Sequence, residues 1–227
     1  MADMTVPQLA RLLNVGDRYA RTLVEDGTLT ARQLPSGEWL IDSDSVARFM
    51  IRRKPAGRGL DTDTAWAILY ELSGIRASGL LPPATYARVR KRIRTMTPEA
   101  IAVAVSGRTT TQHYRSANAA KAQADLIPTA RAASDIIATE LLADTRRVAG
   151  YVPAGTTVAE YARTHFMVPD TAGHDTLYEN TAPGGLTEAL PAVVAADLAV
   201  STDTRERSAG LRALGALRND WRLSPNR

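Results

Sequence analysis

The spacing of apolar positions along the first fifty residues predicts a small domain of helix, turn, helix, hairpin and helix. Apolar residues recur every three or four positions in two short stretches, which is the period of an amphipathic helix. Apolar and polar residues then alternate on either side of a turn, which predicts two short strands. The predicted elements are helices at 6–13 and 17–26, strands at 31–34 and 39–41, and a closing helix from about residue 43.

Polar residues stand where these helices are predicted to begin. Thr5 precedes the first helix, Asp17 opens the second, and Asp42 or Ser43 precedes the third, so each can accept hydrogen bonds from unpaired helix amides. Gly27 follows the second helix, and glycine tolerates the positive φ that commonly ends a helix.

The second helix has a polar outward face suited to DNA. Its apolar residues Ala20, Leu23 and Val24 share the opposite face. A helix of this kind fits the major groove, while a hairpin beside it lies along the backbone. The alternative is a small helical cap on a larger domain, with solvated arginines. The residues expected to contact DNA are Arg18, Tyr19, Arg21 and Thr22 on the helix, and Arg32, Gln33 and Ser36 on the hairpin.

Four consecutive stretches of this region carry a family resemblance. They read QLARLLNV, DRYARTLVEDG, RQLPSGEWLI and DSDSVARFM. In this order they resemble the excisionase-type, MerR-like winged helix-turn-helix domains. The resemblance implies a DNA-binding domain over residues 1–54. Asp17 departs from the family, which commonly carries Ser or Arg there, and its carboxylate would repel phosphate while capping the helix.

The rest of the chain is predicted to be mainly helical, with a small β contribution near its end. Pro and Gly make residues 55–60 a linker. Arg53 and Lys54 just before it form either a phosphate-tracking arm or part of a solvated hinge. A basic helical domain is expected over 61–145 and a small α+β and helical region over 146–227. The predicted elements are helices from 61, 82, 97, 128, 157, 190 and 203, a strand at 148–152 and a hairpin at 168–180.

Charge is concentrated in the middle of the chain. The net charge is only +4, but residues 76–131 hold ten basic and two acidic residues. Five of the cations crowd the helix predicted after Pro82, where they repel one another without an anionic partner. We expect Arg88, Lys91 and Arg92 to contact phosphates; the alternative is a solvated face.

Three later segments carry a second resemblance. They are DTAWAILYELSG, RVRKRIR and ADLAVSTDTRERSAGLRAL. Their order is similar to that in actinobacterial antitoxins encoded beside AbiEii-type nucleotidyltransferase toxins. The resemblance implies an autoregulating antitoxin, with double-stranded operator DNA and a toxin protein as partners. The alternatives are a phage or plasmid repressor and a recombination directionality factor.

Several other function classes lack support in the residues. Without Cys there are no disulfides or thiolate metal sites, and no apolar run approaches the ~20 residues of a membrane helix. The three His are scattered, and no Gly-rich phosphate loop or Gly-x-Ser-x-Gly elbow is present. We therefore expect a cytoplasmic protein that is not an enzyme, with no catalytic residues, metal or cofactor.

Overall fold

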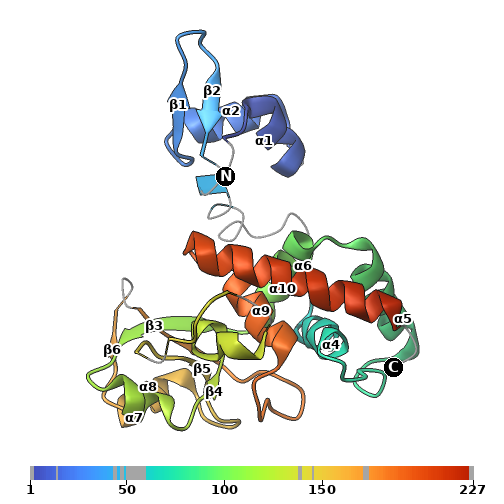
Figure 1. The fold of residues 1–227 in the computed structure, drawn as a ribbon, viewed down its shortest axis with the longest axis vertical. Helices are drawn as coiled ribbons and strands as arrows, with labels where there is room; N and C mark the ends of the chain where they lie inside the picture. The colour runs from blue at the N-terminus through green and yellow to red at the C-terminus, as the bar shows by residue number, and fades with distance from the viewer. Residues whose placement is uncertain are drawn as a thin grey trace. The chain divides into compact units, whose positions relative to one another are not determined.

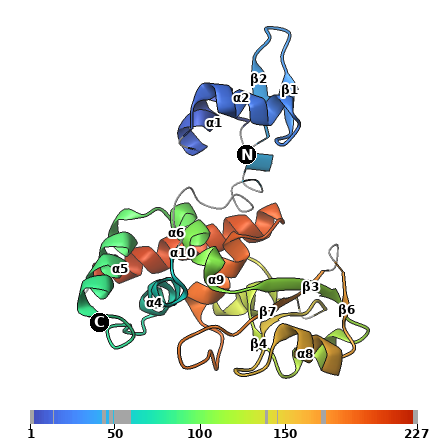
Figure 2. The ribbon, with the colours of Figure 1, turned by 180° about the vertical axis from the view of Figure 1, so that it is seen from behind.

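The chain divides into two compact units, Met1–Gly57 and Arg58–Arg227 (Figures 1 and 2). Each unit has its own hydrophobic core. Both are seen in a computed structural model, which describes residues 3–13, 15–42, 45–46, 49, 60–137, 140–144, 146–170 and 174–224. Helices make up much more of the described chain than strands. The prediction of a mainly α protein with a small β part is confirmed at this level.

The first unit contains two short helices and a hairpin in the predicted order, while the closing helix predicted from about residue 43 falls mostly on residues outside those described. The hairpin is antiparallel, with Arg32 opposite Leu40, and its loop extends beyond the helices in both ribbon views. The predicted inward residues of both helices are buried. The elements are α1 (Val6–Leu13), α2 (Asp17–Glu25), β1 (Ala31–Gln33) and β2 (Trp39–Ile41).

The helix starts in this unit agree only in part with the predicted caps. Gly16 occupies the N-cap position of α2 without a side-chain hydrogen bond, and Asp17 is the first helical residue. The prediction that Asp17 caps this helix is therefore wrong, although its carboxylate still lies near the positive end of the helix dipole. Asp42 does act as predicted, because its carboxylate accepts from the Ser45 amide at 3.1 Å.

Five helices form the larger part of the second unit. All of α9 except Pro191 is buried, as its apolar sequence predicts. The long helix α10 packs against α9, α6 and α4 (Figure 1). Asp61, Thr97 and Asp203 cap α4, α6 and α10 through their side chains. The bounds are α4 (Thr62–Leu72), α5 (Pro83–Thr95), α6 (Pro98–Val105), α9 (Pro191–Ala199) and α10 (Thr204–Leu223).

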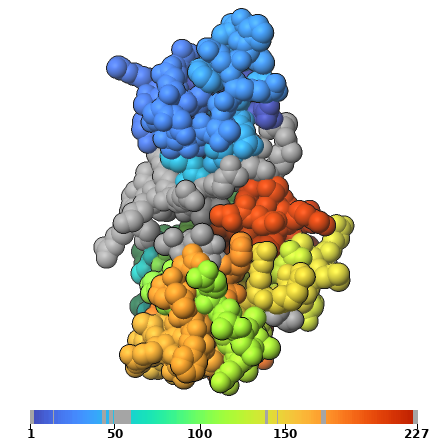
Figure 3. Space-filling view, turned by 90° about the vertical axis from the view of Figure 1, so that its left-hand side faces the viewer, coloured from blue at the N-terminus to red at the C-terminus, as the bar shows by residue number. Residues whose placement is uncertain are grey.

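A five-stranded sheet forms the rest of this unit. Its strand order is β4-β5-β7-β3-β6; β5 and β7 are parallel, and the other pairs are antiparallel. Figure 3 shows green residues of the 111–125 stretch beside orange residues of the 158–178 stretch on one face. The Tyr161 hydroxyl joins these stretches by donating to the Ala122 carbonyl at 2.9 Å. The elements are β3 (Thr111–Arg115), α7 (Ala119–Gln123), β4 (Ile127–Pro128), β5 (Ala149–Tyr151), α8 (Val158–Thr164), β6 (Val168–Pro169) and β7 (Asp175–Tyr178).

The predicted hairpin at 168–180 is wrong. Both of its arms are strands, but they do not pair with each other, because β3 lies between them and pairs with both. The stretch 109–125, which the sequence leaves without a strand, supplies this central partner. The sheet also draws strands from both sides of position 145, so the ranges 61–145 and 146–227 belong to one compact unit.

The amphipathic helix predicted from Pro128 is also wrong. A short 3₁₀ helix, η2 (Ala130–Ile136), stands there, with non-helical backbone angles at Ala133. Pro128 belongs to β4, and the Thr129 amide donates to the Ala149 carbonyl at 3.1 Å, so sheet pairing holds the chain extended up to this point. Leu142, an apolar residue of the stretch predicted to be this helix, is 82% exposed.

Candidate nucleic-acid interface

The outward face of α2 is exposed and polar. Arg18, Tyr19, Arg21 and Thr22 are all exposed, while the other side of the helix packs on α1. The predicted division of α2 into a core face and a solvent face is therefore confirmed. The Thr22 hydroxyl donates to the Arg18 carbonyl at 3.1 Å, which turns it back along its own helix.

Arg18 and Arg21 keep their charges available to a partner. Within the described residues, neither forms an ion pair with an acid of the protein. The nearby acids of the same helix are Asp17 and Glu25, at its two ends. Guanidinium groups that are not paired with an acid can donate two parallel hydrogen bonds to guanine or to phosphate oxygens.

The hairpin residues predicted to contact DNA have partners within the unit. Arg32 forms an ion pair with Asp3 at 3.2 Å, and its side chain is 69% exposed. The Gln33 side chain donates through Nε2 to the Gly37 carbonyl at 3.1 Å, and the Ser36 hydroxyl accepts from the Glu38 backbone amide at 3.5 Å. These bonds shape the hairpin turn. Of these three residues only Arg32 is charged. Because its ion pair with Asp3 is exposed, a phosphate can compete with the Asp3 carboxylate for the guanidinium.

The cations predicted in the second unit lie on α5. Arg88 and Lys91 are exposed and Arg92 is half-buried, whereas Val89 and Ile93 are fully buried. The Arg88 guanidinium donates to the Thr85 hydroxyl at 2.8 Å. Helix α5 itself carries no acidic residue. Arg53 and Lys54 lie outside the described residues.

Two further cations of α5 pack against an aromatic ring. The Arg90 and Arg94 guanidinium carbons lie 5.4 and 5.8 Å from the centre of the Trp221 ring of α10. Arg218 of α10 donates to the carbonyls of Ile93 and Arg94 at 2.8 and 2.7 Å. These contacts join the C-terminal ends of α5 and α10, so two of the five cations of α5 take part in packing.

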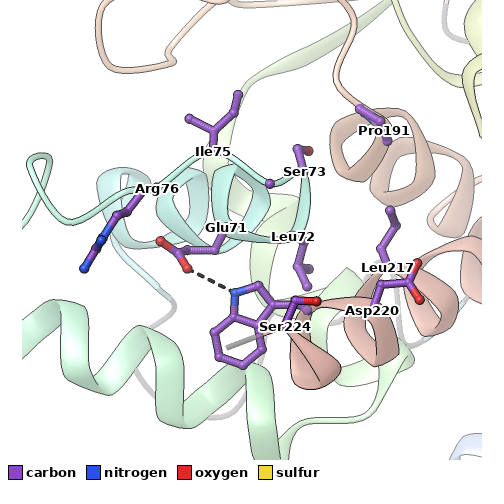
Figure 4. A pocket seen from close by; sticks show the side chains of 11 residues that line it. Glu71, Leu72, Ser73, Ile75, Arg76, Pro191, Leu217, Asp220 and Ser224 are labelled. Carbon is purple, nitrogen blue, oxygen red and sulfur yellow. Dashed lines mark hydrogen bonds between the residues drawn. The ribbon is translucent and has the colours of Figure 1, made fainter. Parts of the chain in front are cut away.

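A concavity of about 230 Å³ opens beside this joint, between the C-terminal ends of α4 and α10 (Figure 4). Glu71, only 5% exposed, reaches it from α4. Its carboxylate accepts from the Trp221 indole at 3.0 Å, the Ala77 amide at 2.9 Å and the Tyr86 hydroxyl at 2.9 Å. Both oxygens of the Glu71 carboxylate thus accept hydrogen bonds from neutral donors on α10, α5 and the loop after α4. The carboxylate therefore holds these segments together.

A buried polar network in the second unit was not identified from the sequence. Arg108, 3% exposed, donates to the Asp197 carboxylate and to the Tyr151 hydroxyl. The second Asp197 oxygen accepts from Thr129 at 2.7 Å and from Tyr151 at 3.0 Å. The one available signal was Asp197 itself, an acid in an otherwise apolar helix.

The network is buried, and burial together with the neighbouring charges shifts the pKa values of Arg108 and Tyr151. Burial alone lowers the pKa of the Arg108 guanidinium, but the adjacent Asp197 charge raises it above its ordinary value. Burial raises the pKa of Tyr151 well above 10.0. Arg108 therefore stays charged and Tyr151 neutral, as expected for a structural ion pair inside a core.

Other kinds of site find no support in the described part of the chain. No group of three or more His, Cys, Asp or Glu side chains there is placed to hold a metal ion. Among the described helices, none has the length and apolar character that crossing a bilayer requires. No protein-family model, no curated protein and no solved structure matches this chain.

Proposed function

We propose that this protein is a sequence-specific regulator of transcription that binds double-stranded operator DNA through its first unit. The observation that carries the proposal is the exposed face of α2, whose two arginines have no acidic partner among the described residues. Arg18 and Arg21 would contact base edges in the major groove, together with Tyr19 and Thr22.

The remaining predicted residues would position the protein on the duplex. Arg32 would exchange its ion pair with Asp3 for a phosphate, while Gln33 and Ser36 keep the hairpin turn in shape. On α5, Arg88, Lys91 and Arg92 would add phosphate contacts, which increase affinity for any sequence. The proposed activity needs no catalytic group.

We further propose that the regulator is the autoregulating antitoxin of a toxin–antitoxin pair. This rests on the resemblance of the segments in α4, α5 and the α9–α10 region, and on the size of the second unit, which exceeds what phosphate contacts need. A phage or plasmid repressor is the alternative. Co-expression with the product of the neighbouring gene separates the two, because only an antitoxin restores growth that this product inhibits.

Footprinting on the DNA upstream of the gene, followed by fluorescence anisotropy with the protected duplex and a scrambled one, tests DNA binding directly. Arg21→Ala is expected to weaken specific binding by about 1–3 kcal/mol and to blur discrimination at one base. Arg163→Ala on α8 is the matched control, an exposed helical arginine of the second unit. Equal losses on the two duplexes, or equal losses in both variants, would refute the assignment of α2 to base recognition.

A further inference from the structure

The sheet of the second unit brings three arginines and a histidine from three distant parts of the chain to one of its ends. Strand β3 runs antiparallel to β7, and β5 runs parallel to it, so the end of β3 lies beside the starts of the other two. Arg115 ends β3, Arg146 and Arg147 precede β5, and His174 precedes β7. All four line one concavity of about 570 Å³.

A single buried carboxylate holds the backbone under this concavity. Asp175 is 7% exposed. One of its oxygens accepts from the amide and the hydroxyl of Ser116, at 2.7 and 2.6 Å, and the other accepts from the Val148 amide at 2.9 Å. Asp175, Ser116 and Val148 directly follow His174, Arg115 and Arg147. The carboxylate therefore fixes the chain at three points, next to two arginines and a histidine.

Arg115, Arg146 and Arg147 are matched in number by Asp144, Asp170 and Asp175, but among the described residues these acids do not form ion pairs with all three arginines. Both oxygens of Asp175 accept hydrogen bonds from the donors just named. The Asp144 carboxylate accepts from Nε and Nη2 of Arg146 at 2.9 and 3.0 Å. Asp170 also belongs to the lining. Arg115 and Arg147 are exposed, and no ion pair joins either of them to an acid in the part of the chain that the structure describes.

Two exposed guanidinium groups and an imidazole at the rim of a concavity suit a compact anion. Guanidinium presents a planar fork of donors that matches phosphate oxygens and binds them in pairs. We propose that this concavity binds the phosphate group of a small ligand, either inorganic phosphate or a phosphomonoester, between Arg115 and Arg147. The site lies in the second unit and does not depend on the proposed DNA binding.

Calorimetric titration of the full-length protein with inorganic phosphate tests the proposal, with sodium chloride at equal ionic strength as the blank. A nucleoside 5′-monophosphate and the same nucleoside without phosphate form two further arms. Saturable binding of phosphate or of the monophosphate, and none of the bare nucleoside, is expected. Tighter binding of the monophosphate would identify a phosphomonoester as the ligand, and tighter binding of inorganic phosphate would identify the free ion.

Arg115→Gln and Arg147→Gln are each expected to weaken this binding by about tenfold, because each removes a charge-assisted pair of hydrogen bonds. Arg163→Gln, at an exposed position of α8, should leave it unchanged. Amide NMR shifts of the wild-type protein at Ser116 and Val148 map the site without any variant. Absence of saturable binding, equal losses in all three variants, or shifts confined to α5 would overturn the proposal.

A duplex DNA competitor separates this site from the DNA surface. If phosphate stays bound when duplex is added at constant ionic strength, the small-ligand assignment holds. If duplex displaces it, the concavity belongs to the nucleic-acid interface and the small-ligand proposal fails. The direct binding readouts do not involve operator recognition, so their failure leaves the proposed function of α2 untouched.

Discussion

At the scale of single residues, the buried Arg108–Asp197 pair should be the most sensitive point of the second unit. Asp197→Ala leaves a guanidinium inside the core without its counter-charge and also removes the acceptor of Thr129 and Tyr151. We expect the free energy of unfolding to fall by about 3–5 kcal/mol. Denaturant titration measures this change, with Arg146→Ala as control.

The control breaks an ion pair of the same type at the surface. The Arg146 side chain is 88% exposed. Its loss should lower stability less than Asp197→Ala does, because water and salt screen the exposed guanidinium and the hydrogen bond from the Arg146 backbone amide to Asp144 remains. Comparable losses in the two variants would show that burial does not set the strength of the core pair.

The same surface pair makes a prediction about pH. Hydrogen bonds from the Arg146 side chain and backbone lower the pKa of Asp144 from 3.8 to about 2. A carboxyl with a lowered pKa stabilises the folded state above pH 3.8, and this contribution is lost as the pH falls towards 2. NMR titration of the Asp144 carboxyl should give the low pKa, and Arg146→Ala should move it back towards 3.8. An unchanged titration in the variant would assign the shift to another group.

At the scale of elements, two glycines of α10 offer a matched pair of substitutions. A Cβ at Gly210 would lie 2.6 Å from the Ala195 carbonyl oxygen and would also collide with the Ala199 amide, both on α9. Gly210→Ala is therefore expected to lower stability by about 1–3 kcal/mol, as overpacking does. At Gly215 the nearest atom is Pro98 Cγ, at 3.5 Å.

Gly215→Ala should consequently leave stability unchanged or raise it by up to about 1 kcal/mol, because alanine loses less backbone entropy in a helix. Thermal unfolding followed by circular dichroism compares the two variants on one helix. If both variants gained stability equally, helix propensity rather than the close approach of α9 and α10 would control this position.

The elements that could be predicted from sequence are those whose signals are local. Caps and apolar spacing located α4, α5, α6 and α8 to within a few residues, because a helix satisfies its hydrogen bonds within itself. Strand β3 was missed because its sequence is polar and its partners, β6 and β7, lie more than fifty residues away. The buried network of Arg108 could not be predicted from the sequence for the same reason, because its members come from four separated segments.

The candidate interface follows the same rule. The exposure of the α2 face could be predicted, since helical periodicity alone places Arg18 and Arg21 opposite Leu23 and Val24. The contacts of the α5 cations could not be predicted, because two of these cations pack on Trp221. Trp221 lies more than a hundred residues further along the chain. Periodicity shows which residues face away from a core, but not which distant residue meets them.

At the scale of the whole molecule, the proposed function assigns different kinds of DNA contact to the two units. Lys91→Ala on α5 should weaken binding to operator and scrambled duplex alike, because it removes a phosphate contact that carries no sequence information. The slope of log K against log salt should fall by about 1, since about one fewer counterion is released. Arg21→Ala should instead weaken operator binding selectively.

Anisotropy titrations at four salt concentrations separate the two effects, and Lys121→Ala is the control for a lysine of the second unit outside α5. An unchanged salt slope in Lys91→Ala would remove α5 from the interface and leave DNA binding to the first unit.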